Sequence, residues 1–422
     1  MEKFGLVLEG GGAKGAYEIG ACKALDDLNV KFSAVTGTSV GALNGAMVAQ
    51  HDLEKAWHLW ENIHPSQVMN IDENKLSQLT RLEIKPGDMR YYIKIFGEII
   101  AEGGVDVTPL KHLIQRYVNE RKLRTSDTDF GMVTVSFSDR KALELFVSDI
   151  PFGQVADYLF ASANFPLFRS AKIGDKIYLD GGIYDSLPIR MLTARGYTSL
   201  ITIRVNGMGI KRKVNLENCH VINIEAREPL GGPLHFNAKN SQKNLKLGYY
   251  DAFRAMKALA GHYYYIDLEH PDEYFFDYFS HLKPEIIKKI GKVMAIKSEI
   301  PPKRMLFEKI LPRLIELFKL PEKSGYGDIA VAIAEKMAIE LNVERFKIYH
   351  FDQLVNQIIQ NYYKKSSNKK EKGLNLISHL GFLSLFSGDL MLKKLVKQLL
   401  NDDIIKALKW DRKSESSFGS TP

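Results

Sequence analysis

Cysteine is scarce in this chain of 422 residues, which contains only Cys22 and Cys219. Two cysteines cannot build a disulfide framework, so we expect a reducing compartment. Cys22 falls in an apolar helical segment, where it is expected to act as a small space-filling side chain. No run of 18 apolar residues is present, so no membrane-spanning helix is expected. Residues 1–4 lead directly into an apolar strand without a signal-peptide pattern, which favours a cytoplasmic location.

Charge of one sign is in excess only in the last third of the chain. The net charge is +8, and residues 271–422 contribute 26 Lys and Arg against 19 Asp and Glu. The chain is 45% hydrophobic and 10% aromatic, which excludes wholesale disorder and supports a sizeable core. The length allows two or three domains. We expect no nucleic-acid partner.

Clusters with metal-ligand spacing are also absent. No group of His, Cys, Asp and Glu has the separations that zinc sites use, so we expect neither a metal nor a cofactor. Eleven histidines are present, but none combines a strand end with a local motif. His220 is the best candidate for a general base, yet it precedes a predicted strand and therefore lies at the wrong end for an active face.

A Gly-x-Ser-x-Gly motif lies between a predicted strand and a predicted helix. The apolar run 32–35 leads into Gly37-Thr38-Ser39-Val40-Gly41, and a helical run follows to residue 50. This order is typical of a nucleophile elbow, in which a sharp turn lifts the serine hydroxyl off the backbone. Larger side chains in place of Gly37 and Gly41 would collide there. The alternative is a structural turn in which Ser39 only caps the helix.

A glycine-rich loop follows the first predicted strand. The apolar run 4–8 precedes Gly10, Gly11 and Gly12, and a helix is predicted soon after Lys14. Consecutive glycines allow backbone N–H groups to crowd a developing negative charge, and the helix N-terminus adds its dipole. The loop is therefore interpreted as an oxyanion hole, with Lys14 as an additional nearby charge. Because neighbouring parallel strands place their C-terminal loops side by side, this loop is expected to face Ser39.

The same glycines match a dinucleotide-binding fingerprint, Gly10-x-Gly12-x-x-Gly15. Such a site requires an acidic residue about 20 residues further on, at the end of the second strand. The nearest acids, Asp26 and Asp27, come too early, within the predicted helix. A phosphate-binding P-loop is excluded because Gly-Lys-Ser/Thr is missing. An oxidoreductase is therefore a poor alternative.

An aspartate ends another predicted strand. Residues 176–179 deliver Asp180, which is followed by Gly181 and Gly182. A plain Asp-Gly turn is the structural alternative. In the functional interpretation, Asp180 accepts the Ser39 proton directly, which requires burial to raise its pKa.

Together the three motifs resemble the patatin-like phospholipase family. Gly10-Gly11-Gly12-Ala13-Lys14-Gly15, Gly37-Thr38-Ser39-Val40-Gly41 and Asp180-Gly181-Gly182 occur in that family's order and spacing, and the similarity covers residues 5–195. One departure is Ser186, where many relatives have asparagine before Leu-Pro. The resemblance implies a three-layer α/β/α fold with a mainly parallel central sheet.

The resemblance also implies lipid acyl hydrolysis by a Ser–Asp dyad without histidine. It makes Ser39 the nucleophile, Asp180 the proton acceptor and Gly10–Gly12 the oxyanion hole. The expected supporting residues are Lys14, Gly15, Gly37, Gly41, Gly181 and Gly182.

The expected organisation is a catalytic core over residues 5–195, with the fold completed by about residue 270. A helical, all-α region over 271–413 and a disordered tail over 414–422 follow. The C-terminal helices resemble no known family.

Three other segments have open interpretations. Residues 89–100 are expected to form either a cap over the site or a helix packed on the core. Residues 208–213 form a basic loop, which is interpreted as a solvated face in preference to a site. Residues 364–372 form a predicted basic loop before the most apolar part of the chain, 374–386. Basic charge beside such a helix suits an anionic bilayer, and a core helix is the alternative.

The sequence therefore predicts a metal-independent esterase that cleaves fatty acyl esters of phospholipids or lysophospholipids, peripheral on the inner membrane surface. The alternative is a regulatory or docking protein in which the helical C-terminal region binds a protein partner and lipid turnover is incidental.

Overall fold

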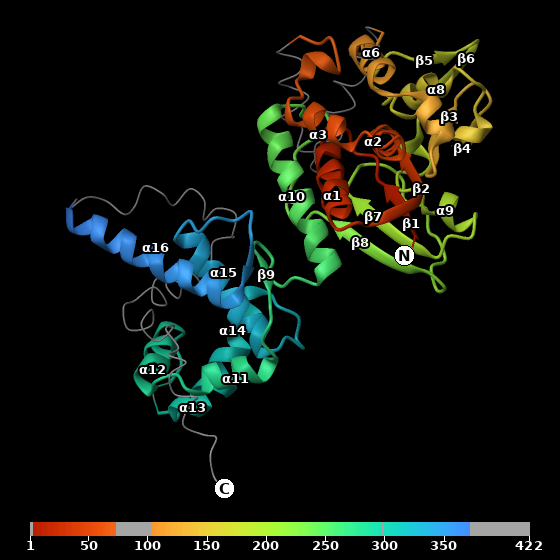
Figure 1. Cartoon of the computed structure of the whole chain (residues 1–422). Coiled ribbons are helices and arrows are strands. Elements are labelled where there is room, and N and C mark those ends of the chain that lie inside the picture. The colour runs from red at the N-terminus through yellow and green to blue at the C-terminus, as the bar shows by residue number, and fades with distance from the viewer. Residues whose placement is uncertain (1–2, 73–102, 298, 372–422) are drawn as a thin grey trace. The chain divides into compact units, whose positions relative to one another are not determined.

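The computed structural model describes residues 3–72, 103–297 and 299–371, with side chains described up to residue 365. The chain divides into two compact units, Met1–Lys257 and Ala258–Pro422 (Figure 1). Each unit has a core of its own and is treated separately below.

The N-terminal unit is built on a sheet of eight strands. Their bounds are β1 Lys3–Leu8, β2 Lys31–Thr38, β3 Asp129–Ser136, β4 Lys141–Phe146, β5 Ala171–Ile173, β6 Lys176–Asp180, β7 Ser199–Arg204 and β8 His220–Glu225. Hydrogen-bonded neighbours follow the path β5-β6-β3-β2-β1-β7-β8, and β4 also pairs with β3. The five strands β3, β2, β1, β7 and β8 are parallel, whereas β4 and β6 run antiparallel to β3, and β5 runs antiparallel to β6. The predicted mainly parallel sheet is confirmed.

Helices cover both faces of this sheet. They are α1 Gly15–Asp27, α2 Val40–Ala49, α3 Leu53–Glu61, α6 Thr108–Tyr117, α7 Glu120–Thr125, α8 Val155–Ser162, α9 Ile189–Thr193 and α10 Ala238–Lys257. Side chains alternate between the faces of a strand. On β1, Val7 joins the apolar cluster that contains Met191 and Leu192 of α9, so Leu6 and Leu8 face the layer of α1, α2 and α10. The predicted α/β/α layering is thereby confirmed.

Helix α10 packs along α1 (Figure 1). The Tyr17 hydroxyl on α1 donates a hydrogen bond of 2.9 Å to the Asp251 carboxylate on α10. Tyr17 is fully buried. This contact ties residues 238–257 to the first helix of the unit, well beyond the segment that carries the three motifs.

The C-terminal unit is helical, as predicted. Its helices are α11 Asp272–Ser280, α12 Pro284–Val293, α13 Pro302–Met305, α14 Leu311–Phe318, α15 Tyr326–Glu340 and α16 Phe351–Glu371, with a π-helical turn over Leu306–Ile310. Two short strands are also present, and one of them lies within the region 271–413 that was predicted to be all-α. These are β9 Tyr265–Asp267 and β10 Ile348–His350, which pair in parallel.

One predicted loop of this unit is wrong. Residues 364–371 continue helix α16 instead of forming a basic loop, because lysine and glutamate there are good helix formers. The predictions for residues 89–100, 374–386 and 414–422 lie outside the described residues. Across the part of the chain that the structure describes, no helix combines the length and apolar character needed to cross a bilayer.

Candidate active site

Strand β3 brings the two expected catalytic residues together. Strand β2 pairs with β3 up to the Thr38–Val133 pair, and β6 pairs with the same edge of β3 from the Thr134–Asp180 pair. Strand β4 occupies the other edge. Because β2 is parallel and β6 antiparallel to β3, the C-terminal ends of β2 and β6 meet head-on. Ser39 and Asp180 lie at this meeting point.

Ser39 has a strained backbone. Its φ of 56° and ψ of −125° are rare for a residue with a side chain. A Cβ at Gly37 would lie 2.2 Å from the Gly41 carbonyl oxygen, so only glycine permits this sharp turn from β2 into α2. The motif therefore adopts the strand–turn–helix geometry of a nucleophile elbow.

A buried serine that the sequence did not single out holds the elbow. The Ser39 N–H donates to the Ser162 hydroxyl at 3.0 Å, and this hydroxyl donates to the Val133 carbonyl at 2.6 Å. Ser162 is fully buried at the end of α8. A sequence signal for it is the run of small residues 161–163 before Pro166.

Asp180 is buried, with 6% of its surface exposed. Loss of hydration raises the pKa of Asp180 to about 6, and contacts with the Ser39 side chain and the Gly182 N–H act in the opposite direction. The Gly182 N–H donates to the carboxylate at 2.7 Å. This carboxyl can therefore exchange a proton near neutral pH.

The glycine loop lies against Ser39. Strands β1 and β2 pair at Leu8 and Gly37, and a Cβ at Gly10 would lie 3.4 Å from the Ser39 Cβ. The Gly10 N–H donates to the Ser186 carbonyl at 2.9 Å. Within the described residues, the N–H groups of the other two loop glycines have no hydrogen-bond partner.

Close contacts with other segments also fix the positions of Gly12 and Lys14 in the glycine loop. Gly12 has a φ of +59°, and a Cβ there would lie 2.2 Å from the Pro233 carbonyl oxygen. The Lys14 ammonium donates to the Asn206 carbonyl at 2.7 Å, and burial lowers the pKa of Lys14. Lys14 therefore ties the glycine loop to the segment that follows β7.

An apolar cavity of about 400 Å³ opens onto these groups. The glycine loop, Ser39 and Asp180 are among the residues that line it. Most other lining residues are aliphatic or aromatic, among them Leu43, Met47, Leu59, Trp60, Leu110, Leu113, Ile114, Phe165, Phe168, Leu234 and Phe236. A cavity of this composition suits a hydrocarbon chain.

Residues 208–213, interpreted as a solvated face, are mostly exposed, but part of this loop also contributes to the cavity. Met208, Gly209 and Ile210 line the cavity. The loop is drawn in by buried Glu9, whose carboxylate accepts N–H donors from residues 205–207 and pairs with Lys211 at 2.8 Å. The composition of residues 208–213 could not show that the buried Glu9 carboxylate holds this loop next to the cavity.

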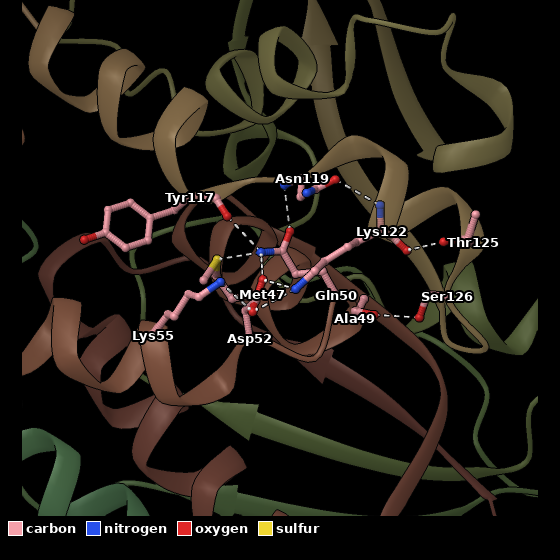
Figure 2. A network of polar contacts seen from close by, with 10 residues as sticks. All are labelled: Met47, Ala49, Gln50, Asp52, Lys55, Tyr117, Asn119, Lys122, Thr125 and Ser126. Atoms are coloured by element: carbon pink, nitrogen blue, oxygen red, sulfur yellow. Dashed lines mark hydrogen bonds and ion pairs between the residues drawn. The ribbon is translucent and has the colours of Figure 1, made fainter.

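A polar network lies at the C-terminal end of α2, next to cavity-lining Tyr117 (Figure 2). Gln50 is 2% exposed and lies at its centre. Its amide donates to the Tyr117 carbonyl and the Asp52 carboxylate, both at 2.8 Å, and accepts from the Asn119 N–H at 2.9 Å. Lys122 pairs with Asp52 at 3.0 Å. The network joins α2 to the α6–α7 junction.

In the described part of the chain, one group of His, Asp and Glu side chains could hold a metal ion. It comprises Asp267, Glu269 and His350, with ligand atoms within 4.8 Å of one another. All three belong to the C-terminal unit, whereas the cavity and the residues around Ser39 belong to the N-terminal unit.

Comparisons with known proteins found matches to parts of this chain. Two fungal proteins named lysophospholipase NTE1 match short stretches: that of Aspergillus terreus is 48% identical over 46 residues, and that of Chaetomium globosum 47% over 50. These stretches are 11% and 12% of this chain, which spans only 3% of either relative.

Two solved structures are also similar. VipD from Legionella pneumophila is 13% identical with a TM-score of 0.38, covering 100% of this chain and 94% of its own. The structure of ExoU with SpcU from Pseudomonas aeruginosa is 12% identical with a TM-score of 0.29, covering 96% and 90%. A family model described as Patatin-like phospholipase matches residues 6–193, the segment that carries the elbow, the glycine loop and Asp180. This segment of the chain is a patatin-like phospholipase domain.

Proposed function

We propose that the N-terminal unit hydrolyses fatty acyl esters of phospholipids or lysophospholipids at a membrane surface, with Ser39 and Asp180 as a catalytic dyad. The observation that carries this proposal is the head-on meeting of β2 and β6 on one edge of β3. It sets a strained serine beside a buried carboxyl in the lining of an apolar cavity. The family match over residues 6–193 supports the same reaction class.

In the proposed reaction, the Ser39 oxygen attacks the ester carbonyl carbon and its proton passes to Asp180. The tetrahedral intermediate collapses, the ester C–O bond breaks, and the leaving alcohol takes the proton from Asp180. Water then attacks the acyl-enzyme, Asp180 accepts a water proton and returns it to the Ser39 oxygen, and the fatty acid leaves. A pKa of about 6 keeps Asp180 mostly ionised at pH 7 while leaving it a stronger base than an exposed carboxylate.

The negative charge of the tetrahedral intermediate requires donors. The N–H groups of Gly11 and Gly12 have no partner in the described structure, whereas the Gly10 N–H is engaged with the Ser186 carbonyl. We therefore assign the oxyanion to Gly11 and Gly12, with Gly10 shaping the loop. One such donor typically changes the rate by about 10²- to 10³-fold.

The test is release of fatty acid from mixed phospholipid vesicles and from dispersed lysophospholipid, without calcium. Wild-type protein is compared with Ser39→Ala and Asp180→Asn, and exposed Ser170→Ala and Asp175→Asn serve as matched controls. We expect both site variants to lose at least about 10³-fold in rate and both controls to stay at the wild-type rate. A fully active Ser39→Ala variant, or loss of wild-type activity in chelator, would contradict the proposal.

A further inference from the structure

Three exposed apolar side chains surround part of the cavity mouth. Ile183 follows the Asp180 turn, and Met208 and Ile210 lie in the loop after β7. They are 40%, 54% and 57% exposed, yet each also lines the cavity. We call these three residues the rim. Water contact with large apolar side chains at one place is unfavourable, so such a patch indicates an interaction surface.

The exposure of the rim does not come from a loosely held loop. The Ile210 N–H donates to the Gly182 carbonyl at 2.9 Å, and its carbonyl accepts from the Ser186 N–H at 2.6 Å. The buried Glu9 carboxylate accepts the Gly207 N–H at 3.1 Å. The backbone is thus fixed on both sides of Met208 while the side chain projects into solvent.

Basic residues follow the rim directly. Lys211, Arg212 and Lys213 are all exposed. Lys211 pairs with Glu9, and the Arg212 guanidinium lies 4.4 Å from the centre of the Tyr184 ring. In the described structure neither Arg212 nor Lys213 forms an ion pair. Two positive charges beside the mouth therefore remain available to a negatively charged partner.

We propose that the rim inserts into an anionic phospholipid bilayer, with Arg212 and Lys213 bound at its headgroups, so that the cavity mouth faces the membrane. This inference rests on the proposed function, because a lipid substrate must pass from a bilayer into the cavity. Exposed apolar side chains with adjacent cations are the combination that interfacial binding requires. The mouth and the rim share residues, so docking brings the bilayer to the opening that leads to Ser39.

Insertion is tested at position 208 itself. The full chain carries Ser39→Ala to prevent hydrolysis, Cys219→Ser to remove the partly exposed thiol, and Met208→Cys labelled with an environment-sensitive dye. Cys22 is buried and stays unlabelled. The control carries the same dye at Phe137→Cys, which is 61% exposed and does not line the cavity.

With vesicles of phosphatidylcholine and phosphatidylserine, we expect a blue shift of the position 208 dye and quenching by spin-labelled acyl chains. Pure phosphatidylcholine should give a much weaker response, and the dye at position 137 should give none. A silent dye at position 208 while the chain sediments with the vesicles would overturn the proposal, because another surface would then dock. Equal responses at both positions would overturn it too.

The charge contribution is tested separately in the Ser39→Ala chain. Arg212→Glu with Lys213→Glu should weaken sedimentation with the anionic vesicles at least about tenfold, since each cation contributes roughly fivefold. Lys172→Glu, an exposed lysine of β5, is the matched control and should bind as the parent does. Unchanged binding of the double variant would refute the role of the two cations.

These measurements do not require turnover. Rim insertion with no hydrolysis by the wild-type chain would refute the proposed function alone. Hydrolysis of dispersed lysophospholipid without rim insertion would refute the docking proposal alone.

Discussion

Replacing Asp180 by asparagine should stabilise the N-terminal unit while abolishing catalysis. Burial raises the pKa of Asp180 from 3.8 to about 6, a shift of about two units. Each unit corresponds to about 1.4 kcal/mol, so the ionised carboxylate lowers the free energy of unfolding by about 3 kcal/mol. Asparagine keeps an oxygen for the Gly182 N–H and carries no charge.

Because folding raises the pKa of Asp180, the stabilisation by Asp180→Asn depends on pH. Below pH 3.8 the carboxyl is protonated in both the folded and the unfolded chain, and it contributes nothing. Between pH 3.8 and about 6 only the unfolded chain ionises, so wild-type stability falls as pH rises. Above about pH 6 the carboxyl is ionised in both states, and the full destabilisation of the folded wild-type chain is present. The advantage of Asp180→Asn should therefore grow from near zero at pH 4 to about 3 kcal/mol at pH 8.

Urea unfolding between pH 4 and pH 8 measures this difference. Trp57 and Trp60 lie in the N-terminal unit, and Trp410→Phe in every variant makes tryptophan fluorescence specific for that unit. Ser39→Ala is the control for loss of the dyad contact without loss of the charge. Its stability should still fall as pH rises, and the fall should extend to a higher pH than in wild type, because the Ser39 contact lowers the pKa of Asp180. A constant difference between Asp180→Asn and wild type across this range would refute the reasoning.

Three further outcomes follow from the same structure. The kcat/KM for a dispersed ester should fall as the pH drops through about 6, because protonated Asp180 cannot accept the serine proton; a flat profile from pH 5 to 8 contradicts that role. Gly12→Ala should lower kcat by at least about 10²-fold, because the new Cβ would lie 2.2 Å from the Pro233 carbonyl oxygen and move the loop; wild-type kcat would show that the loop position is unimportant. Gln50→Ala should lower the free energy of unfolding by about 1–3 kcal/mol in urea titrations, since it removes the hydrogen bonds of the buried Gln50 amide to the Tyr117 carbonyl and the Asn119 N–H; a loss below about 0.5 kcal/mol would mean that the network is dispensable.

The elbow and the glycine loop could be predicted from sequence because each is a local pattern. An apolar run, a glycine turn and a helix follow one another within some 15 residues around Ser39, and the same order surrounds Gly10–Gly12. Adjacent parallel strands then place the two loops side by side, as the pairing of Leu8 with Gly37 confirms.

The position of Asp180 close to Ser39 could not be predicted in the same way. The sequence shows that it ends a strand, but the direction of that strand follows from pairing with residues more than 40 positions away. Because β6 runs antiparallel to β3, its C-terminal end points toward the C-terminal end of β2. Asp180 therefore lies at the end of β2 and not next to it in a neighbouring parallel strand. The contribution of the loop around Met208 to the cavity could not be predicted for a similar reason, because its partner Glu9 lies about 200 residues earlier.

Backbone groups at positions 185 and 186 join the parts of the site. The Thr38 hydroxyl donates to the Asp185 carbonyl at 2.7 Å, and the Gly10 N–H donates to the Ser186 carbonyl. The Ser186 N–H donates to the Ile210 carbonyl at 2.6 Å, so the nucleophile strand, the glycine loop and the rim converge on two residues. The buried Ser186 hydroxyl has no hydrogen-bond partner in the described structure. Serine can therefore stand where many relatives have asparagine, because the links at this position use the backbone.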